Sequence, residues 1–198
     1  MCDILEAGGV DSLTVANIAR ASDLHPNTIN YYFNGKTDML MRFHTYLYDN
    51  ERRGLPAVYC SVPQCRAEAV CALLQLVDFE LFLAGQQNRA FQKIITYLQG
   101  QVDVEPQVRH YLSKKQEEHC AFLRAALQRY CAAGIVRADT LEDGLGALTV
   151  LRSGYALVSQ YRDTSQVTRY MTGAREHIVR MMLADGLEKP LEKALPPQ

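Results

Sequence analysis

Two short amphipathic segments joined by a tight turn, within residues 13–40, limit the folds open to this chain more than any other feature. In the first segment, Val15, Ile18 and Ala19 recur at helical spacing. Thr14 precedes them and can cap the first turn by accepting a backbone N–H hydrogen bond. The pattern predicts a short helix that ends near residue 21.

A reversal of the chain follows this helix. Ser22 and Asp23 favour a turn, because aspartate is one of the few residues besides glycine that tolerates left-handed backbone angles. We expect Leu24 to place an apolar anchor between the two helices. Pro26 suits the first position of a second helix, where its missing N–H is not needed, and Ile29 marks the buried face of that helix.

The opposite face of the second helix is polar. Its amide, hydroxyl and phenol groups are suited to base edges and phosphates, and a lysine follows where the next helix begins and can approach a phosphate. A generic helical hairpin is the alternative interpretation. The candidate DNA-binding residues are Thr14, Asn17, Pro26, Asn27, Thr28, Asn30, Tyr31, Tyr32 and Lys36.

The segment resembles the helix-turn-helix of TetR-family bacterial transcriptional regulators. It departs from the family pattern at Asp23, which replaces a glycine, at His25, which replaces a common serine, and at Asn30, where tyrosine is most frequent. The resemblance covers about the first fifty residues and implies a repressor that binds a palindromic operator as a homodimer and is released by a small-molecule effector. The residues in register are Thr14, Val15, Ile18, Ala19, Ser22, Tyr32, Phe33, Lys36 and Leu40.

Charge and length leave a second interpretation open. The only basic residues within positions 1–40 are Arg20 and Lys36, against five acidic ones, although phosphate neutralisation normally supplies much of the affinity for DNA. Only residues 2–7 stand where the family has a full first helix, so either the start codon lies upstream or part of the DNA-binding core is lost. The alternative is a helical ligand-binding or interaction module of the same fold with weak or lost DNA binding.

Helical periodicity continues through the rest of the chain, and we predict an all-α fold. Further helices are expected over residues 36–53, 63–85, 88–98, 106–133, 140–161 and 165–184. We place a DNA-binding domain with its connector helix at residues 1–53, an effector-binding and dimerisation domain at 54–185, and a poorly ordered, proline-containing tail at 186–198.

The last two long helices carry the best oligomerisation signal. Leu145 and Leu148 lie on an apolar face of the first, Gly144 permits close helix approach, and Ile178 and Met182 belong to a wide apolar band on the second. The resemblance implies that these hairpins, at about residues 140–184, form a four-helix dimer interface. Burial within one subunit is the alternative.

An effector cavity between the two ends of the chain is also implied by the resemblance. Asp78 and Arg152 interrupt apolar stripes, and buried charges need partners, so these two side chains could pair with each other or bind a polar ligand group. The alternative for each of them is an ordinary ion pair or a position that faces solvent. Ordinary core packing is the alternative for the aromatic residues. The candidate ligand-binding residues are Asp78, Phe82, Tyr97, His119, Phe122, Arg152 and Tyr155.

Several classes of protein are disfavoured by what the sequence lacks. It has no signal-peptide pattern and no apolar run near the ~20 residues of a membrane span, so we expect a cytoplasmic protein without membrane contact. No hydrolase, phosphate-loop or metalloprotease motif is present, and an enzyme is not expected. The six cysteines have no metal-ligand spacing, so no metal and no cofactor are expected; a thiol sensor of oxidants or electrophiles is the alternative to plain packing.

Overall fold

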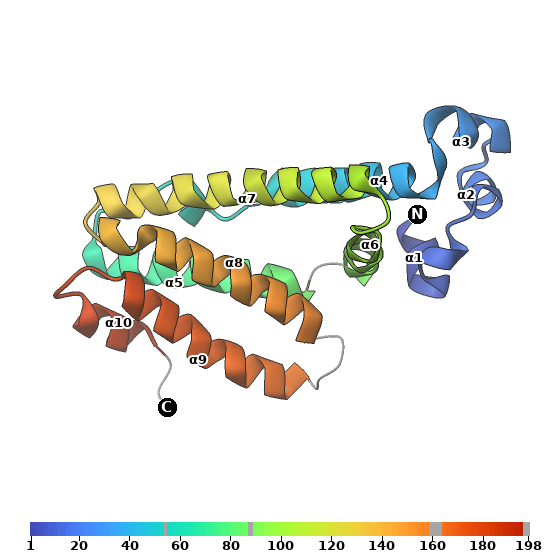
Figure 1. Ribbon diagram of the computed structural model, residues 1–198. Coiled ribbons are helices and arrows are strands. Elements are labelled where there is room, and N and C mark those ends of the chain that lie inside the picture. Colours follow the sequence, from blue (N-terminus) through green and yellow to red (C-terminus); the bar gives the residue numbers. More distant parts are fainter. Residues whose placement is uncertain (54, 87–88, 159–163, 196–198) are drawn as a thin grey trace. The chain divides into compact units, whose positions relative to one another are not determined.

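The computed structural model describes residues 1–53, 55–86, 89–158 and 164–195. Over these residues it is helical without a named strand, apart from one isolated antiparallel bridge between Val136 and Leu183, which confirms the all-α prediction. No helix in these ranges is long and apolar enough to cross a membrane. The elements in chain order are α1 (Cys2–Gly8), η1 (Val10–Ser12), α2 (Val15–Ser22), α3 (Pro26–Tyr32), α4 (Gly35–Arg53), η2 (Ala57–Tyr59), α5 (Arg66–Gln86), α6 (Arg89–Gly100), α7 (Pro106–Ala132), η3 (Ala138–Thr140), α8 (Leu141–Val158), α9 (Thr164–Met182) and α10 (Glu188–Ala194) (Figure 1).

The helices group into two compact units. The N-terminal unit comprises residues 1–54 and 87–116, and the C-terminal unit comprises residues 55–86 and 117–198. This grouping differs from the expected boundary after residue 53, because α6 and the start of α7 belong with the first helices. Helical periodicity finds the helices but does not say which of them pack together.

The core of the N-terminal unit explains this grouping. Leu5 of α1 and Leu40 of α4 are buried in one cluster with Ile94 and Leu98 of α6. Lys93 also donates from its ammonium to the carbonyl of Leu5 at 2.6 Å. The Leu5 carbonyl also accepts the backbone N–H of Gly9 at 2.9 Å, and the Lys93 ammonium donates in addition to the carbonyl of Glu6 at 3.2 Å. A cation at the carbonyl end of a helix complements the helix dipole. The short α1 is therefore held by α6 rather than by its own length.

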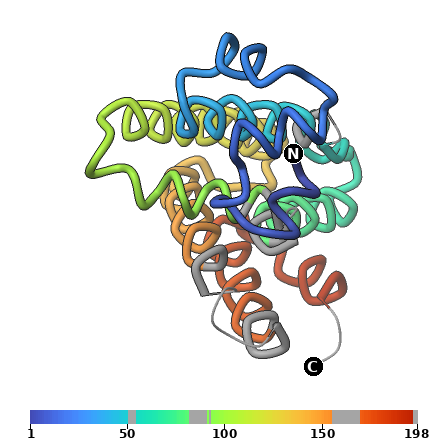
Figure 2. The backbone as a smooth tube through the Cα atoms, turned by 90° about the vertical axis from the view of Figure 1, so that its right-hand side faces the viewer, coloured from blue at the N-terminus to red at the C-terminus, as the bar shows by residue number. Residues whose placement is uncertain are grey.

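The C-terminal unit is a layered bundle in which α5 contacts α8, α9 and α10, and α8 lies beside α9 (Figures 1 and 2). Much of the apolar stripe on the α8–α9 pair is used inside this unit: Leu145, Leu148, Ile178 and Met182 are buried in its core. Gly144 is needed there, because a Cβ at this position would collide with the Met182 side chain. Burial within the subunit, the alternative raised from the sequence, thus accounts for these residues.

The tail from residue 186 is the clearest failure of the sequence-based prediction, since residues 188–194 form α10 on the surface of α5. Leu187 and Leu191, one helical turn apart, are buried. Pro190 favours disorder when the sequence is considered alone, but it occupies the first turn of α10, where a missing N–H costs nothing. The end of the chain therefore contributes to the core.

Candidate functional site

The first helix of the predicted helix-turn-helix is fixed by its own polar residues. Thr14 accepts the backbone N–H of Asn17 at 3.2 Å, as its capping position predicts. The Asn17 side chain in turn donates to the carbonyl of Ser12 at 2.8 Å. Both candidate DNA-binding residues thus order the start of α2, and Thr14 also remains exposed.

The turn between α2 and α3 confirms one expectation and overturns another. Asp23 adopts left-handed angles, with φ 54° and ψ 37°, as predicted. The proposed anchor Leu24 is wrong, because its side chain is 47% exposed. Ile18, Ala19 and Ile29 instead supply the buried contacts between the two helices.

A histidine caps α3. The Nδ1 atom of His25 accepts the backbone N–H of Asn27 at 3.2 Å, and Pro26 occupies the first helical position. Because an accepting Nδ1 carries no proton, this cap requires the neutral imidazole. His25 therefore performs the capping that serine performs in the family pattern.

The outward face of α3 carries exposed polar groups. Tyr31 is 84% exposed and Tyr32 is 60% exposed, and their rings meet edge to face at 5.2 Å. Asn27 and Asn30 are also exposed, and Thr28 is partly buried. Among the described residues, no hydrogen-bond partner is found for the two phenol hydroxyls. This face holds donors and acceptors on a helix whose other side is fixed in the core.

Lys36, the remaining candidate for phosphate contact, already has partners within the N-terminal unit. Its ammonium lies 3.3 Å from a carboxylate oxygen of Asp11 and 5.5 Å from the centre of the Tyr97 ring. The Asp11 side chain is fully exposed, so water screens the ion pair strongly. Lys36 is oriented by these contacts and is only partly exposed.

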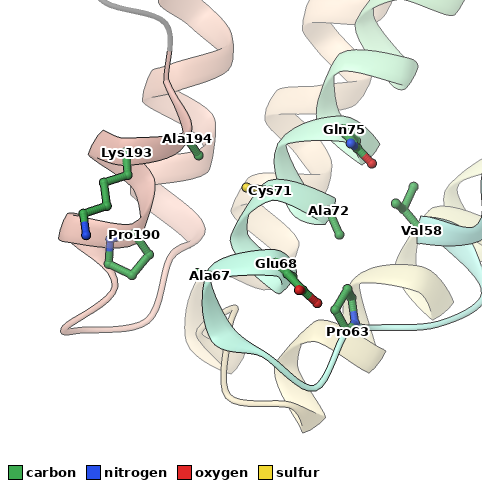
Figure 3. A pocket seen from close by; sticks show the side chains of 10 residues that line it. All are labelled: Val58, Pro63, Ala67, Glu68, Cys71, Ala72, Gln75, Pro190, Lys193 and Ala194. Atoms are coloured by element: carbon green, nitrogen blue, oxygen red, sulfur yellow. The ribbon is translucent and has the colours of Figure 1, made fainter.

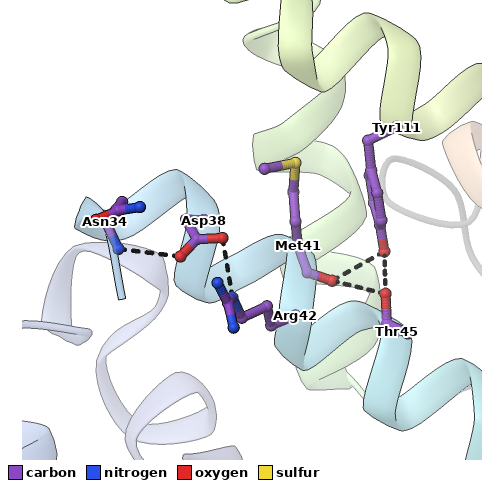
Figure 4. Close-up of polar contacts among 6 residues, drawn as sticks. All are labelled: Asn34, Asp38, Met41, Arg42, Thr45 and Tyr111. Carbon is purple, nitrogen blue, oxygen red and sulfur yellow. Dashed lines mark hydrogen bonds and ion pairs between the residues drawn. The ribbon is translucent and has the colours of Figure 1, made fainter. Parts of the chain in front are cut away.

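The start of α4 is tied to the preceding loop by Asp38 (Figure 4). The Asp38 carboxylate accepts the backbone N–H of Asn34 at 3.0 Å and the Nε–H of Arg42 at 3.0 Å. Burial opposes ionisation, but the hydrogen bonds from Arg42 and Asn34 and the charge of Arg42 outweigh it and lower the pKa of Asp38. The helix that follows the DNA-reading segment therefore begins at a fixed point.

Further along α4, Tyr111 fastens the helix to α7 within the same unit. Its hydroxyl donates to the carbonyl of Met41 at 2.9 Å and lies 2.9 Å from the hydroxyl of Thr45 (Figure 4). His44 also contacts this hydroxyl, at 2.7 Å through Nδ1. Helix α4 is therefore held within this unit both at its start and along its length.

The two charged candidates for effector binding are paired, but not with each other. Asp78 accepts two 3.0 Å hydrogen bonds from Arg175, and Arg152 lies 3.9 Å from the carboxylate of Glu80. The structure therefore contradicts the Asp78–Arg152 pair, one of the options raised from the sequence, and agrees with the alternative that each residue has an ordinary ionic partner. Spacing along the chain cannot reveal the partner of a charge, because the partner comes from another helix.

Glu80 is the centre of a buried polar cluster that the sequence analysis missed. Its side chain is 1% exposed; one carboxylate oxygen accepts the Tyr59 hydroxyl at 2.7 Å and the other lies 2.9 Å from Nε2 of His119. Burial alone would raise the pKa of Glu80, but the hydrogen bond and charge of His119 and the charge of Arg152 hold it below its usual value. The signal available was the second of two acids inside the apolar run of α5, because Glu80 interrupts that run just as Asp78 does.

The aromatic candidates for effector binding lie in different units of the structure. Phe122 stacks on Tyr59 at 5.4 Å in the C-terminal unit, whereas Tyr97 lies under Lys36 in the N-terminal unit. The structure brings His119 and Arg152 together through Glu80. The side chains of Phe82 and Tyr155 lie outside the described residues.

The comparison with known proteins concerns the helix-turn-helix segment. Residues 2–42 match the family model of bacterial regulatory proteins, tetR family. No curated protein and no solved structure matches the chain. The matched residues hold α1, α2, α3 and the start of α4, which are the elements that carry the exposed polar face. Residues 2–42 therefore form a helix-turn-helix DNA-binding domain of the kind found in bacterial regulatory proteins of the tetR family.

Proposed function

We propose that this regulator is a ligand-responsive repressor that acts in the cytoplasm, binds a palindromic operator as a homodimer, and is released by a small-molecule effector. The observation that carries the proposal is the outward face of α3, where Asn27, Asn30, Tyr31 and Tyr32 are exposed while Ile29 is buried. Amides and hydroxyls so presented suit the donor and acceptor pattern of the major groove.

The direct test is binding to the DNA upstream of the protein's own gene over a range of salt concentrations. We expect specific binding that Asn30→Ala and Tyr31→Ala weaken by about tenfold each, since a good base contact is worth ~1–3 kcal/mol. His110→Ala, an exposed residue of the same unit on α7, is the matched control and should leave binding unchanged. Equal loss in all three variants would refute the assignment of α3.

A second function is supported by the ion pair between Asp11 and Lys36. In this pair, Asp11 already binds the ammonium group that is best placed to contact a phosphate. Under this alternative the chain is a ligand-binding or interaction module with weak DNA binding. It predicts the same low affinity for the upstream DNA and for unrelated DNA. A specific affinity at least tenfold above the affinity for unrelated DNA would rule it out.

The dimer is supported by what remains exposed on the α8–α9 pair. Val150 and Tyr170 are 71% and 70% exposed, and Gly146 and Gly173 face open space. Large apolar side chains beside small residues are typical of close helix packing between subunits. We expect Val150→Glu to shift the sedimentation of a micromolar solution toward the monomer, and Val104→Glu, which alters a similarly exposed valine of the other unit, to leave it unchanged. A monomeric unmodified protein would overturn the dimer.

The effector is proposed to bind in the C-terminal unit near His119, Phe122 and Arg152, where the Glu80 cluster offers charged and aromatic groups. We further propose that α4 transmits the binding event to the DNA-reading helices, because it is anchored at both its start and its middle. The effect on operator affinity is limited by the ligand's differential affinity for the two states. A ligand that binds tightly without changing operator affinity would exclude this mechanism.

A further inference from the structure

A groove of about 430 Å³ lies in the C-terminal unit, and its lining includes none of the residues proposed for the effector. Ala67, Cys71 and Ala72 of α5 form its floor, and the small size of their side chains leaves the space open (Figure 3). Val58 and Pro63 lie on one side, and α10 lies on the other. The groove therefore depends on the ordered α10 that the sequence analysis did not foresee.

The volume of the groove indicates what kind of molecule it can bind. Pockets for small molecules commonly measure ~300–1,000 Å³. One turn of an α-helix, which is 10–12 Å across and 5.4 Å long, fills roughly 400–600 Å³. The groove thus holds about one turn of a partner helix, which is shorter than the two turns over which a docked helix places its anchors at i, i+3, i+4 and i+7. Its volume of about 430 Å³ lies within the range of small-molecule pockets.

The chemistry of the lining sets the class of that molecule. Apart from Gln75 and the Cys71 thiol, the polar side chains are one carboxylate, Glu68, and one ammonium, Lys193, both exposed. Their charges cancel, so the lining favours neither an anion nor a cation. We propose that this groove is a second ligand site, distinct from the effector site, for a small, neutral, mainly apolar molecule.

The groove adjoins the buried polar cluster through η2. Val58 lines the groove, and its carbonyl accepts the hydroxyl of Tyr130 at 3.0 Å. The next residue, Tyr59, donates to Glu80. An occupant in contact with Val58 therefore presses on the turn that positions the Tyr59 hydroxyl, and binding in the groove is linked to the interior of the C-terminal unit.

The test uses Nile red, a neutral apolar dye whose fluorescence rises when it leaves water, with the full chain. Ala67→Leu fills the floor of the groove from an exposed position and should weaken dye binding by about tenfold. Ala121→Leu makes the same change at an exposed position of α7 in the same unit and should leave it unchanged. No dye binding, or equal binding by both variants, would overturn the proposal.

A measurement on the unsubstituted protein keeps the proposal testable even if Ala67→Leu disturbs folding. Cys71 lines the groove, whereas Cys60 and Cys65 are exposed thiols of the same unit outside its lining. Saturating dye should slow alkylation of Cys71 by iodoacetamide about fivefold or more, and should leave the other two rates unchanged. Unchanged Cys71 alkylation with dye bound would place the dye elsewhere and refute the groove as its site.

Discussion

Replacing Glu80 by glutamine tests whether the buried acid holds the C-terminal unit together. The substitution keeps the size of the side chain and an oxygen that can accept the Tyr59 hydroxyl, but it removes the negative charge beside His119 and Arg152. Breaking a fully buried ion pair costs ~3–5 kcal/mol, and leaving a buried hydrogen-bonding group unsatisfied costs ~1–3 kcal/mol. Arg152 keeps some access to water, so we expect Glu80→Gln to lower the free energy of unfolding by about 2–3 kcal/mol.

Urea unfolding at neutral pH, followed by far-ultraviolet circular dichroism, measures this loss. With an m-value of about 2 kcal/mol per molar urea, the midpoint of the transition that belongs to the C-terminal unit should fall by roughly 1–1.5 M. Glu142→Gln is the matched control. The Glu142 carboxylate accepts a hydrogen bond from Arg124 at 2.7 Å, but this pair is exposed, so the substitution should shift the midpoint very little. Equal midpoints for the two variants would refute the structural role of Glu80.

The change of stability with pH provides a second, independent test of Glu80. Burial acts to raise the pKa of Glu80, but the contacts with His119, Arg152 and Tyr59 lower it below the ordinary value of 4.5. A carboxyl with a lowered pKa in the folded state stabilises the protein above its unfolded-state pKa, and this stability is lost as the pH falls through the folded-state pKa. The difference in midpoint between the unmodified protein and Glu80→Gln should therefore shrink below about pH 4.5. A difference that grows in acid would contradict this account.

Three further changes test other parts of the molecule. Leu191→Ala should destabilise the C-terminal unit by ~2–5 kcal/mol in urea unfolding, because Leu191 is fully buried; a loss no larger than that of the exposed control Glu142→Gln would mean that α10 does not pack. His25→Ala should cost the N-terminal unit about 1 kcal/mol in thermal unfolding and His25→Ser should restore it, since serine is a good helix cap, whereas equal melting of the two would dismiss the cap. Asp11→Asn should raise DNA affinity about two- to fivefold by freeing Lys36, while Asp3→Asn, which alters an exposed acid without that contact, should not; equal gains would reduce the effect to net charge.

Local structure was predictable wherever one residue and its near neighbours determine it. Thr14 caps α2, Asp23 takes left-handed angles and Pro26 begins α3, each for a reason contained within four residues of sequence. The long helices α4 and α7 likewise begin and end within a few residues of their expected limits, because glycine and proline mark their ends. These features follow from backbone chemistry, which is the same in every fold.

Features that depend on contacts between distant residues were not predictable. The partner of Lys36 is Asp11, 25 positions earlier, and the partner of Glu80 is His119, 39 positions later. No spacing rule reaches across such separations, so the sequence could not identify Arg175 as the partner of Asp78 or Glu80 as the partner of Arg152. The order of α10 had the same origin: Leu191 is buried only because α5 supplies a surface for it.

The shortage of cations in the DNA-binding segment has a measurable consequence for salt dependence. Residues 1–42 contain Arg20, Lys36 and Arg42 as their only lysine or arginine residues, and carboxylates pair with Lys36 and Arg42. If each subunit of the proposed dimer neutralises one to three phosphates, then log K against log salt should have a slope between about −2 and −5. Weak phosphate attraction lowers binding to all DNA alike, so discrimination must come from the neutral amides and phenols of α3. A filter-binding titration from low to physiological salt measures the slope, and a value steeper than about −8 would show that cations outside this segment dominate the interface.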